Sequence, residues 1–379
     1  MIDTIKLVLD KSMFLVSDVS LFQKETYNQT RGYFKLVQNP SKGGLKSGKY
    51  KPRLTLTKRF NCSGRFEPTL SIELSLPKLM YGNNFVELTN TDFEKVIEKL
   101  SAILKEMGIR IFTHKLIEAP VSSIHYSKNI IFNNGLTPYI LINKIRESNI
   151  RLSSDVDHAQ FRNDGYSYKW HSNTYEVTFY DKLYDLMKSK VSSKRAIEND
   201  NDIQLNLFDK IKRAEKFEVL RMEVRLNNRQ KTRSLFKTLG YNTNLTFKEL
   251  FSSDYSKKVL LHYIKELEFN RPSILNYSST NPKSLLSDLI INNPRLKPQK
   301  ILQLFGLRQA LEHYTERELR GVFNPKSYRV WYRIMQDSRR INAPDQQSPL
   351  QVIKERITEF KSISTVDFDK LMLNNDKYD

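Results

Sequence analysis

The chain is long and strongly basic, and both properties limit its function. It has 379 residues, with 62 Lys and Arg against 42 Asp and Glu, and a formal net charge of +20. Such an excess is typical of proteins that bind a polyanion, since cations that neutralise phosphates release condensed counterions. Ribosome-associated and membrane-surface proteins share this charge balance. The 19 Tyr, 21 Phe and 2 Trp favour nucleic acid, because every base offers a face for stacking.

The sequence also excludes several classes of protein. It contains no apolar stretch of about 18 residues or more, so we expect no transmembrane helix and no membrane partner. Met1–Asp10 is too short and too charged for a signal peptide, and it predicts a first strand instead. The single cysteine, Cys62, excludes an intramolecular disulfide and a cysteine-based zinc site. We therefore expect a cytoplasmic protein.

The periodicity of apolar residues predicts an α+β fold, a mostly antiparallel sheet with helices packed on one face and an α-helical C-terminal region. A catalytic domain is predicted over 1–270, a Pro, Ser and Asn-rich linker over 271–284, and a helical DNA-binding region over 285–379. The predicted strands are Met1–Leu9, Gly32–Val37, Tyr50–Lys58, Thr69–Leu76, Val121–Ile131, Tyr175–Tyr180 and Phe217–Leu226. The predicted helices are Asp92–Met107, Thr137–Ile150, Lys182–Lys190, Tyr255–Glu268 and Lys297–His313, and Ser189–Lys216 is predicted to be a loop or insertion.

Residues 31–66 form a stretch of one charge sign, with ten basic side chains and no acidic one. Pro40–Gly48 predicts a turn between two strands, so the stretch is expected to be a basic hairpin. Such a hairpin can bind a groove of a nucleic acid or clamp a single strand. The alternative is a surface hairpin that only adds solubility. Its interleaved aromatic residues are Tyr33, Phe34, Tyr50 and Phe60. The cations expected to contact DNA are Lys46, Lys49, Lys51, Arg53, Lys58 and Arg59.

The C-terminal region carries a second candidate DNA-binding element. Thr315–Val322 predicts a short helix that begins with a capping box. Asn324 as N-cap and Pro325 at the first helical position then predict a longer helix that ends near Arg339. Two helices around a short turn resemble a helix-turn-helix over 315–340, although any helical hairpin gives the same pattern. The cations of the expected recognition helix are Lys326, Arg329 and Arg333.

Four of the alternating strands each carry one chemically useful residue on the polar face, namely Glu73, His125, Tyr180 and Glu223. If these strands share one sheet, the four side chains converge on its open side. Two carboxylates and an imidazole are a suitable ligand set for Mg²⁺ or Mn²⁺. The alternatives are cross-strand ion pairs for the two glutamates and an ordinary hydrogen-bonded role for the histidine.

Tyr180 is the predicted nucleophile, because it lies where a strand runs into a helix, with Asp181 as the expected N-cap. A phenol with a pKa of about 10 is a poor nucleophile. The metal is therefore expected to polarise a phosphodiester, and Lys182 to favour the phenolate. Attack would leave a phosphotyrosine link, and its reversal would rejoin the strand. Tyr184, one helical turn further on, is the second candidate nucleophile. The arginines that flank Glu223, Arg221 and Arg225, can bind a phosphate.

On these residues the sequence resembles the replication initiators of filamentous phages of the gene II/X type, and more distantly the rolling-circle initiators of plasmids. The segments that carry the resemblance are Leu70–Asn84, Val121–Asn129, Val177–Lys182 with its Tyr-x-Lys pattern, and Leu220–Leu226. Lys300–Ile341 is similar to the helical end region of the family. The order and spacing of the segments are more specific than any one of them.

The resemblance implies a rolling-circle replication initiator that nicks one DNA strand at an origin and forms a 5′-phosphotyrosine intermediate. It implies that Tyr180 is the nucleophile, and that Glu73 and Glu223 are metal or active-site carboxylates. It also implies a requirement for Mg²⁺ or Mn²⁺, a host helicase and polymerase as partners, and the cytoplasm of a bacterial host cell. Several members of the family carry an aspartate where this chain has His125.

Two other functions fit the same patterns. A non-catalytic DNA-binding or copy-control protein could use the basic hairpin and the C-terminal helices on the same fold. An RNA-binding module would show a preference for RNA that depends on the 2′-hydroxyl.

Overall fold

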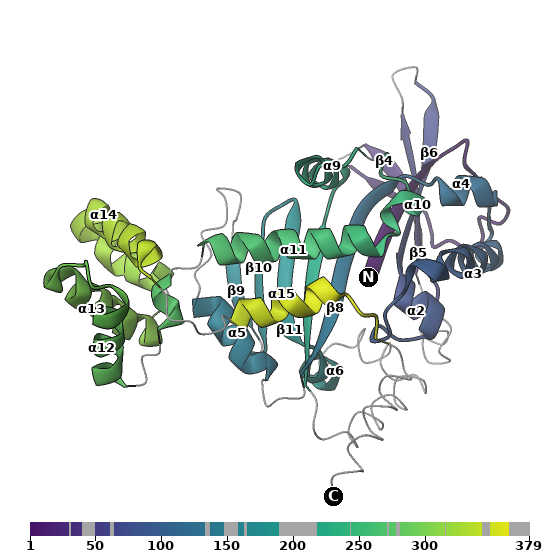
Figure 1. The fold of residues 1–379 in the computed structure, drawn as a ribbon. Helices are drawn as coiled ribbons and strands as arrows, with labels where there is room; N and C mark the ends of the chain where they lie inside the picture. The colour runs from purple at the N-terminus through teal and green to yellow at the C-terminus, as the bar shows by residue number, and fades with distance from the viewer. Residues whose placement is uncertain are drawn as a thin grey trace, which may run out of the picture.

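The computed structural model describes residues 1–29, 32–39, 50–60, 64–132, 137–147, 158–162, 165–188, 218–242, 244–270, 273–277, 281–314, 316–342 and 349–363. The described residues form two hydrophobic cores, a large one of sheet and helices and a small one of helices alone (Figure 1). The predicted α+β fold with a helical C-terminal region is confirmed. No helix within the described ranges combines the length and the apolar character that crossing a membrane requires.

An antiparallel sheet organises the first core and, within the described residues, has ten strands in the order β3-β4-β5-β6-β1-β8-β12-β11-β10-β9. Its strands are β1 Ile2–Asp10, β3 Thr26–Asn28, β4 Tyr33–Gln38, β5 Arg53–Phe60, β6 Phe66–Ser75, β8 Val121–Phe132, β9 His158–Arg162, β10 Ser167–His171, β11 Tyr175–Asp181 and β12 Glu218–Leu226. A separate pair joins β2 (Phe14–Val16) to β7 (Ile109–Ile111). All the strands predicted from alternation are confirmed within one or a few residues at their ends, whereas β2, β3, β7, β9 and β10 were not predicted.

The alternation of side chains along each strand decides which face of the sheet is buried. In β8, Ile124 and Tyr126 are buried in the core, and the Tyr126 hydroxyl donates to the carbonyl of Leu250 at 3.1 Å. His125 and Ser127 point to the opposite face, here called the polar face. The helices of the first core are α2 Leu76–Tyr81, α3 Phe93–Glu106, α4 Thr113–Ile117, α5 Pro138–Glu147, α6 Lys182–Lys188, α9 Arg229–Thr238, α10 Phe247–Leu250, α11 Ser253–Asn270 and α15 Pro349–Glu359, with a 3₁₀ turn at Asn90–Asp92 (Figure 1).

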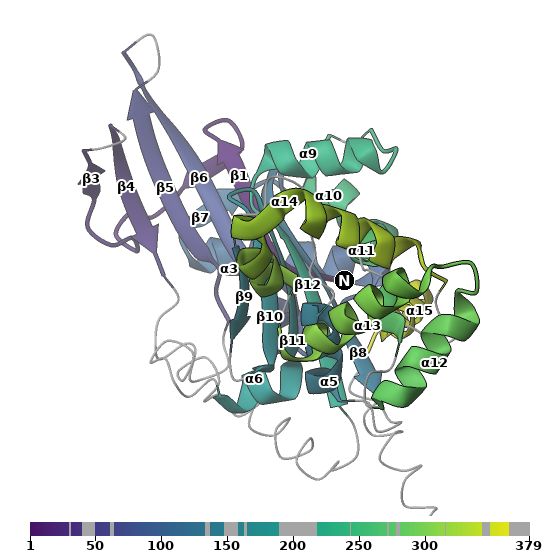
Figure 2. The ribbon, with the colours of Figure 1, turned by 90° about the vertical axis from the view of Figure 1, so that its left-hand side faces the viewer.

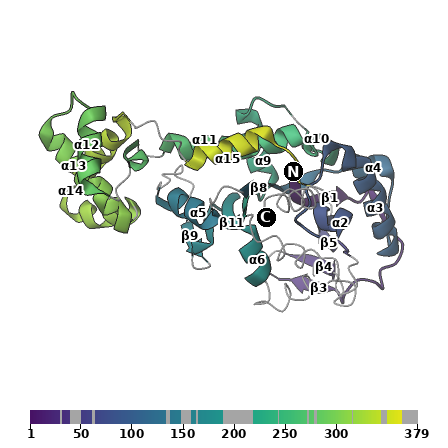
Figure 3. The ribbon, with the colours of Figure 1, turned by 60° about the horizontal axis from the view of Figure 1, so that its bottom comes forward.

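The last helix, α15, returns to the sheet and lies beside α11 (Figures 1 and 3). Its Ile353 is fully buried in the first core. The chain beyond it is held by Glu87, whose N–H donates to the carbonyl of Ile363 at 3.0 Å and whose carboxylate binds Lys128. The predicted boundary is therefore wrong at this end, because 349–363 belongs to the sheet domain and not to a helical region over 285–379.

The second core, here called the helical module, covers residues 273–342 and lies to one side of the sheet (Figure 3). It consists of η4 Ser273–Asn276, α12 Pro282–Asn292, α13 Pro298–His313 and α14 Glu316–Arg340. The predicted linker over 271–284 overlaps this module, because Ile274, Leu275 and Tyr277 are buried in its core. The carbonyl of Tyr277 accepts a hydrogen bond from Arg308 Nε at 2.7 Å, which ties this segment to α13.

The two helices predicted over 315–340 are present as α14 (Glu316–Arg340), in which they meet at a kink at Ser327. Ser327 has φ −170° and ψ 104°, and its hydroxyl accepts from the N–H of Val330 at 3.4 Å. The second half of the helix therefore starts after Ser327, three residues later than the predicted N-cap Asn324. Serine is a favourable N-cap residue. Pro325 lies within the helix, where it has no N–H to donate to the helical hydrogen-bond pattern. The predicted capping residue Thr315 lies outside the described residues.

We expect Ile353→Ala in α15 to lower the free energy of unfolding of the sheet domain by about 2–5 kcal/mol, because it leaves a cavity in a filled core. Urea unfolding monitored by circular dichroism measures this loss. The matched control is Ile291→Ala on α12, whose side chain is 72% exposed, and which we expect to change the stability by less than about 0.5 kcal/mol. An unchanged midpoint for Ile353→Ala would show that α15 does not pack on the sheet in solution.

Candidate active site

Tyr180 lies near the end of β11 on the polar face, where the sequence predicted it. Its neighbours across the sheet are Arg221 of β12 and Ser167 of β10. Its hydroxyl donates to Glu223 Oε2 at 3.4 Å. The predicted junction is confirmed, because Asp181 Oδ1 accepts from the N–H of the third residue of α6 at 2.9 Å and so caps the helix.

Glu223 is a buried carboxylate, 2% exposed, that contacts three of the predicted site residues. Arg225 Nε donates to its Oε1 at 2.8 Å, and His125 Nδ1 lies 3.6 Å from the same oxygen. Burial alone would raise the pKa of Glu223, but Arg225, then Arg221 and His125, lower it to about 2. The carboxylate is therefore ionised, and it acts as a fixed acceptor for the Tyr180 hydroxyl and not as a general base.

Arg221 supplies a second fixed charge beside the phenol. One of its terminal nitrogens lies 3.1 Å from Asp3 Oδ1 and donates to Ser127 Oγ at 2.9 Å, and the other donates to the carbonyl of Asn84 at 2.7 Å. Burial alone would lower its pKa, but Tyr180 and the nearby carboxylates raise it, so the guanidinium stays charged. It is 2% exposed. The predicted role of a DNA-contacting surface cation therefore does not describe this arginine.

Lys182 is fully buried at the first position of α6, directly after the predicted nucleophile strand. Its Nζ donates to Asn84 Oδ1 at 3.1 Å and lies 5.8 Å from the centroid of the Tyr180 ring. Burial, and then the charge of Arg221, lower the pKa of Lys182 to about 7. An amine with this pKa is partly neutral near neutral pH and can accept a proton.

The protonation state of Tyr180 differs from the prediction. Burial raises its pKa well above the ordinary value, and Glu223 adds to this effect, while Arg221 opposes it. The sequence predicted that Lys182 favours a phenolate at Tyr180. In this structure Tyr180 instead keeps its proton. Tyr180 is a protonated phenol whose hydroxyl donates to Glu223, and the amine of Lys182 lies 5.8 Å from the centroid of its ring.

The predicted metal ligands do not assemble. Glu73 is exposed on β6, between Arg53 of β5 and Lys6 of β1 in the register. It lies three strands from Glu223, which alone separates the two residues by about 14 Å at the usual strand spacing, and it is also displaced along the strands. Within the described ranges, no group of three or more His, Cys, Asp or Glu side chains is placed to hold a metal ion. These residues therefore do not fit the predicted Mg²⁺ or Mn²⁺ site. The neighbours of Glu73 across the strands are two cations.

His125 joins the site as a partner of Glu223 and not as part of a ligand triad. Burial lowers its pKa, although the carboxylate of Glu223 opposes this effect. Its neighbour across the sheet is Arg225, whose guanidinium already occupies the Glu223 oxygen that the imidazole faces. A divalent cation there would meet Arg225 and Arg221, and like charges at this distance disfavour it.

Tyr184, the second candidate nucleophile, belongs to a different cluster. Its ring stacks on Tyr166 with centroids 3.7 Å apart and planes at 15°, and Tyr166 contacts Tyr139 of α5 at 5.3 Å. This arrangement buries part of the ring in an aromatic group. Of the two candidates, Tyr180 is the one with a hydrogen bond to Glu223.

The other predicted DNA-binding cations have mixed positions. In the hairpin, Arg53 and Arg59 are exposed, and the Arg59 guanidinium lies 4.9 Å from the centroid of the Tyr33 ring. Lys58 pairs with Glu25 at 2.8 Å. Lys51 lies 3.5 Å from Glu106, while Lys46 and Lys49 lie outside the described residues. On α14, Arg329 and Arg333 are exposed, and the side chain of Lys326 is not described.

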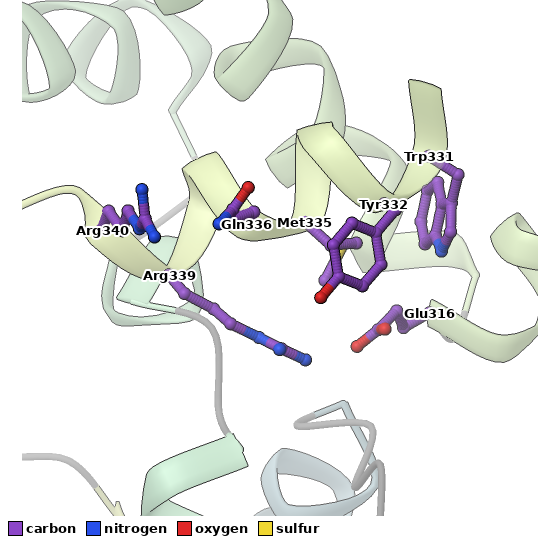
Figure 4. Close-up of a pocket in the computed structure, with 7 residues that line it drawn as sticks. All are labelled: Glu316, Trp331, Tyr332, Met335, Gln336, Arg339 and Arg340. Atoms are coloured by element: carbon purple, nitrogen blue, oxygen red, sulfur yellow. The ribbon is translucent and has the colours of Figure 1, made fainter. Parts of the chain in front are cut away.

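The helical module contains a cavity of about 240 Å³ on the second half of α14 (Figure 4). Figure 4 shows the Tyr332 ring, the Arg339 guanidinium and the Glu316 carboxylate around one space, with Trp331 at its edge. The other lining residues are Met335, Gln336 and Arg340. This cavity was not predicted, because its walls come from both halves of an interrupted helix. Together with the exposed arginines of α14, it gives the module a polar and aromatic surface separate from the Tyr180 site.

Comparison of this chain with models of protein families, with curated proteins and with solved structures found no match. The function is therefore argued from the geometry of the site and from the charge of the chain.

We expect Lys182→Met to stabilise the protein by roughly 1–4 kcal/mol at pH 7, because it removes the cost of burying an ammonium group. The pKa of Lys182 is about 7 in the folded protein and about 10.4 when unfolded. Since the unfolded chain binds the proton more tightly, wild-type stability rises between pH 7 and 10, and the advantage of the variant shrinks there.

Chemical unfolding at pH 7 and pH 9.5 measures both effects, with Lys237→Met as the control, because this lysine is exposed on α9. Lower stability of Lys182→Met at pH 7 would contradict a buried amine with a lowered pKa.

Proposed function

We propose that this chain is a DNA strand transferase with a tyrosine nucleophile, a replication initiator that nicks one strand at an origin to start rolling-circle replication. The observation that carries the proposal is the Tyr180 hydroxyl, hydrogen-bonded to the buried Glu223 and flanked by Arg221 and Lys182. The net charge of +20 supports a polyanionic substrate. A host helicase and polymerase would act on the nicked strand.

The proposed step needs only the side chains of this protein and the DNA strand. Tyr180 Oη attacks the phosphorus of a phosphodiester and passes its proton to the neutral amine of Lys182. A bond forms between Oη and phosphorus, and the bond from phosphorus to the 3′ oxygen breaks. The leaving oxygen takes the proton from Lys182, which gives a 5′-phosphotyrosine link and a free 3′ hydroxyl. Reversal of the same step rejoins a strand, because the energy of the phosphodiester is kept in the link.

Two arginines supply the electrostatic part of this mechanism. Arg225 is partly exposed and extends from the site on β12, where it pairs with Glu223 and with Glu176 at 3.1 Å. It can bind the phosphate oxygens in the transition state, and the buried guanidinium of Arg221 adds its positive charge to the site without contacting DNA. Glu223 orients the phenol, so that the attacking oxygen faces this pair of cations. No step of the proposal passes through a metal ion, since the described residues do not fit one.

The second candidate is a non-catalytic DNA-binding or copy-control protein. The observation that favours it is the exposed pair Arg329 and Arg333 on α14, beside an aromatic and polar cavity. Such a surface can bind DNA with no chemistry at Tyr180.

We expect the purified protein to form a covalent adduct with DNA that resists denaturation. The adduct should be absent in Tyr180→Phe, because the phenol oxygen is the attacking atom, and present in Tyr184→Phe. A denaturing gel with labelled single-stranded DNA pools and supercoiled candidate origins measures it, in Mg²⁺, in Mn²⁺ and in a chelator. An adduct that survives Tyr180→Phe and disappears in Tyr184→Phe would contradict the assignment. Binding to these substrates with no adduct in any condition would favour the second candidate.

The rate of adduct formation is expected to rise with pH and to level off above about pH 7, following the loss of the proton from Lys182. The pKa of Tyr180 is raised, so the phenol itself does not titrate in this range. Lys182→Met should lower the rate roughly 10²- to 10⁴-fold and remove this pH dependence. Single-turnover rates between pH 5.5 and 9 measure the profile. A profile that keeps its midpoint in Lys182→Met would show that another group is the base.

A further inference from the structure

Four aromatic side chains form a continuous row across the edge of the sheet. They are Tyr27 of β3, Phe34 of β4, Phe66 of β6 and Phe60 of β5, here called the aromatic row. The ring centroids of neighbours lie 4.9 Å apart for Tyr27 and Phe34, 5.7 Å for Phe34 and Phe66, and 3.9 Å for Phe66 and Phe60. The row crosses four adjacent strands and so spans about 14 Å.

The aromatic row continues the apolar face of the sheet beyond the core. Leu36, Leu56 and Leu70 pair across three strands and are the last buried residues on this face. Further outward on this face lies the row, and there the rings are open, with Phe60 59%, Tyr27 54% and Phe66 44% exposed. Figure 2 shows β3 to β6 as an edge that projects beyond the helices. Contiguous exposed rings of this kind mark an interaction surface.

The charge around the aromatic row indicates the partner. Residues 31–66, which supply three of its four rings, carry ten basic residues and no acidic one. Lys58 lies between Phe34 and Pro68 in the register, on the face of the row. On the reverse face, Arg59 and Arg53 are exposed. An apolar protein partner on the row would bury Lys58 and its partner Glu25 at a cost, whereas a nucleic acid can pair Lys58 with a phosphate and can meet Arg59 and Arg53 where a strand passes round the edge of the sheet.

We propose that the aromatic row is a stacking surface for the bases of single-stranded DNA, whose phosphates meet Lys58 on this face and the other hairpin cations where the strand passes round the edge of the sheet. This inference rests on the proposed function and names the form of DNA that this edge holds. A sheet that presents adjacent rings can stack several unpaired bases without reading their sequence. Duplex DNA does not offer its base faces to such a surface, so the row selects the unpaired strand.

The test is a binding assay that needs no cleavage. The full-length protein carrying Tyr180→Phe is titrated with a fluorescent oligo-dT, and the anisotropy gives the dissociation constant. A second probe has the same length and charge and lacks bases. The variants added to this background are Phe60→Ala, Phe66→Ala and the conservative Phe60→Tyr, with Phe112→Ala as control. Phe112 is 72% exposed at the start of α4, apart from the row.

We expect Phe60→Ala and Phe66→Ala each to weaken oligo-dT binding by about fivefold or more, the effect of losing one stacked base. Phe60→Tyr and Phe112→Ala should stay within about twofold of the background. The probe without bases should bind all variants alike, because it retains only the contacts to phosphate. Circular dichroism confirms folding, and all the substituted rings lie on the surface.

Three outcomes would overturn the inference. Unchanged binding of oligo-dT by both alanine variants would show that the row does not stack on bases. Equal weakening for the probe without bases would assign the effect to charge. A change from dimer to monomer in Phe60→Ala, with DNA binding unchanged, would make the row a protein interface. None of these involves the adduct at Tyr180, so failure of the inference and failure of the proposed function are separate results.

Discussion

The central constraint on this structure is the burial of Glu223 on the polar face of the sheet. An ionised carboxylate inside a protein needs partners, because burial without them costs several kcal/mol. Here Arg225 donates to it at 2.8 Å, and the Tyr180 hydroxyl at 3.4 Å. The Tyr180 contact joins β11 to β12 and holds the phenol in one direction. The ion pair therefore positions the nucleophile as well as satisfying the charge.

The same burial sets the two protonation states that the chemistry needs. Removal from water disfavours the charged form of every group. It raises the pKa of Tyr180, which keeps its proton, and lowers that of Lys182 to about 7. In the proposed reaction the amine of Lys182 can then accept a proton near neutral pH. An exposed lysine could not, because it stays charged up to about pH 10. The site gains this property at the expense of stability, since a buried amine weakens the fold.

The sequence predicted the part of the site that depends on alternation within a strand. Tyr180 and Glu223 were assigned to one face by period two, and the structure confirms this. Glu73 fits the same pattern, but alternation within a strand does not predict the order of the strands in the sheet. In the structure β1 and β8 lie between the strand of Glu73 and β12. The low pKa of Lys182 was not predictable, because its burial depends on Asn84 from a distant loop. The docking of α15 and the contact of Phe34 with Phe66 are likewise long-range contacts that leave little local signal.

The two faces of the sheet divide the proposed work on DNA. By the register, Arg59 and Arg53 of the hairpin share the face of Tyr180, whereas Phe60 and Phe66 lie on the opposite one. The nucleotides that stack on the aromatic row therefore cannot be the ones that contact the phenol. The strand has to pass around the hairpin edge, where the cations are. The row would then retain a strand that is already separated, while the polar face of β11 and β12 holds the phosphodiester that is cut.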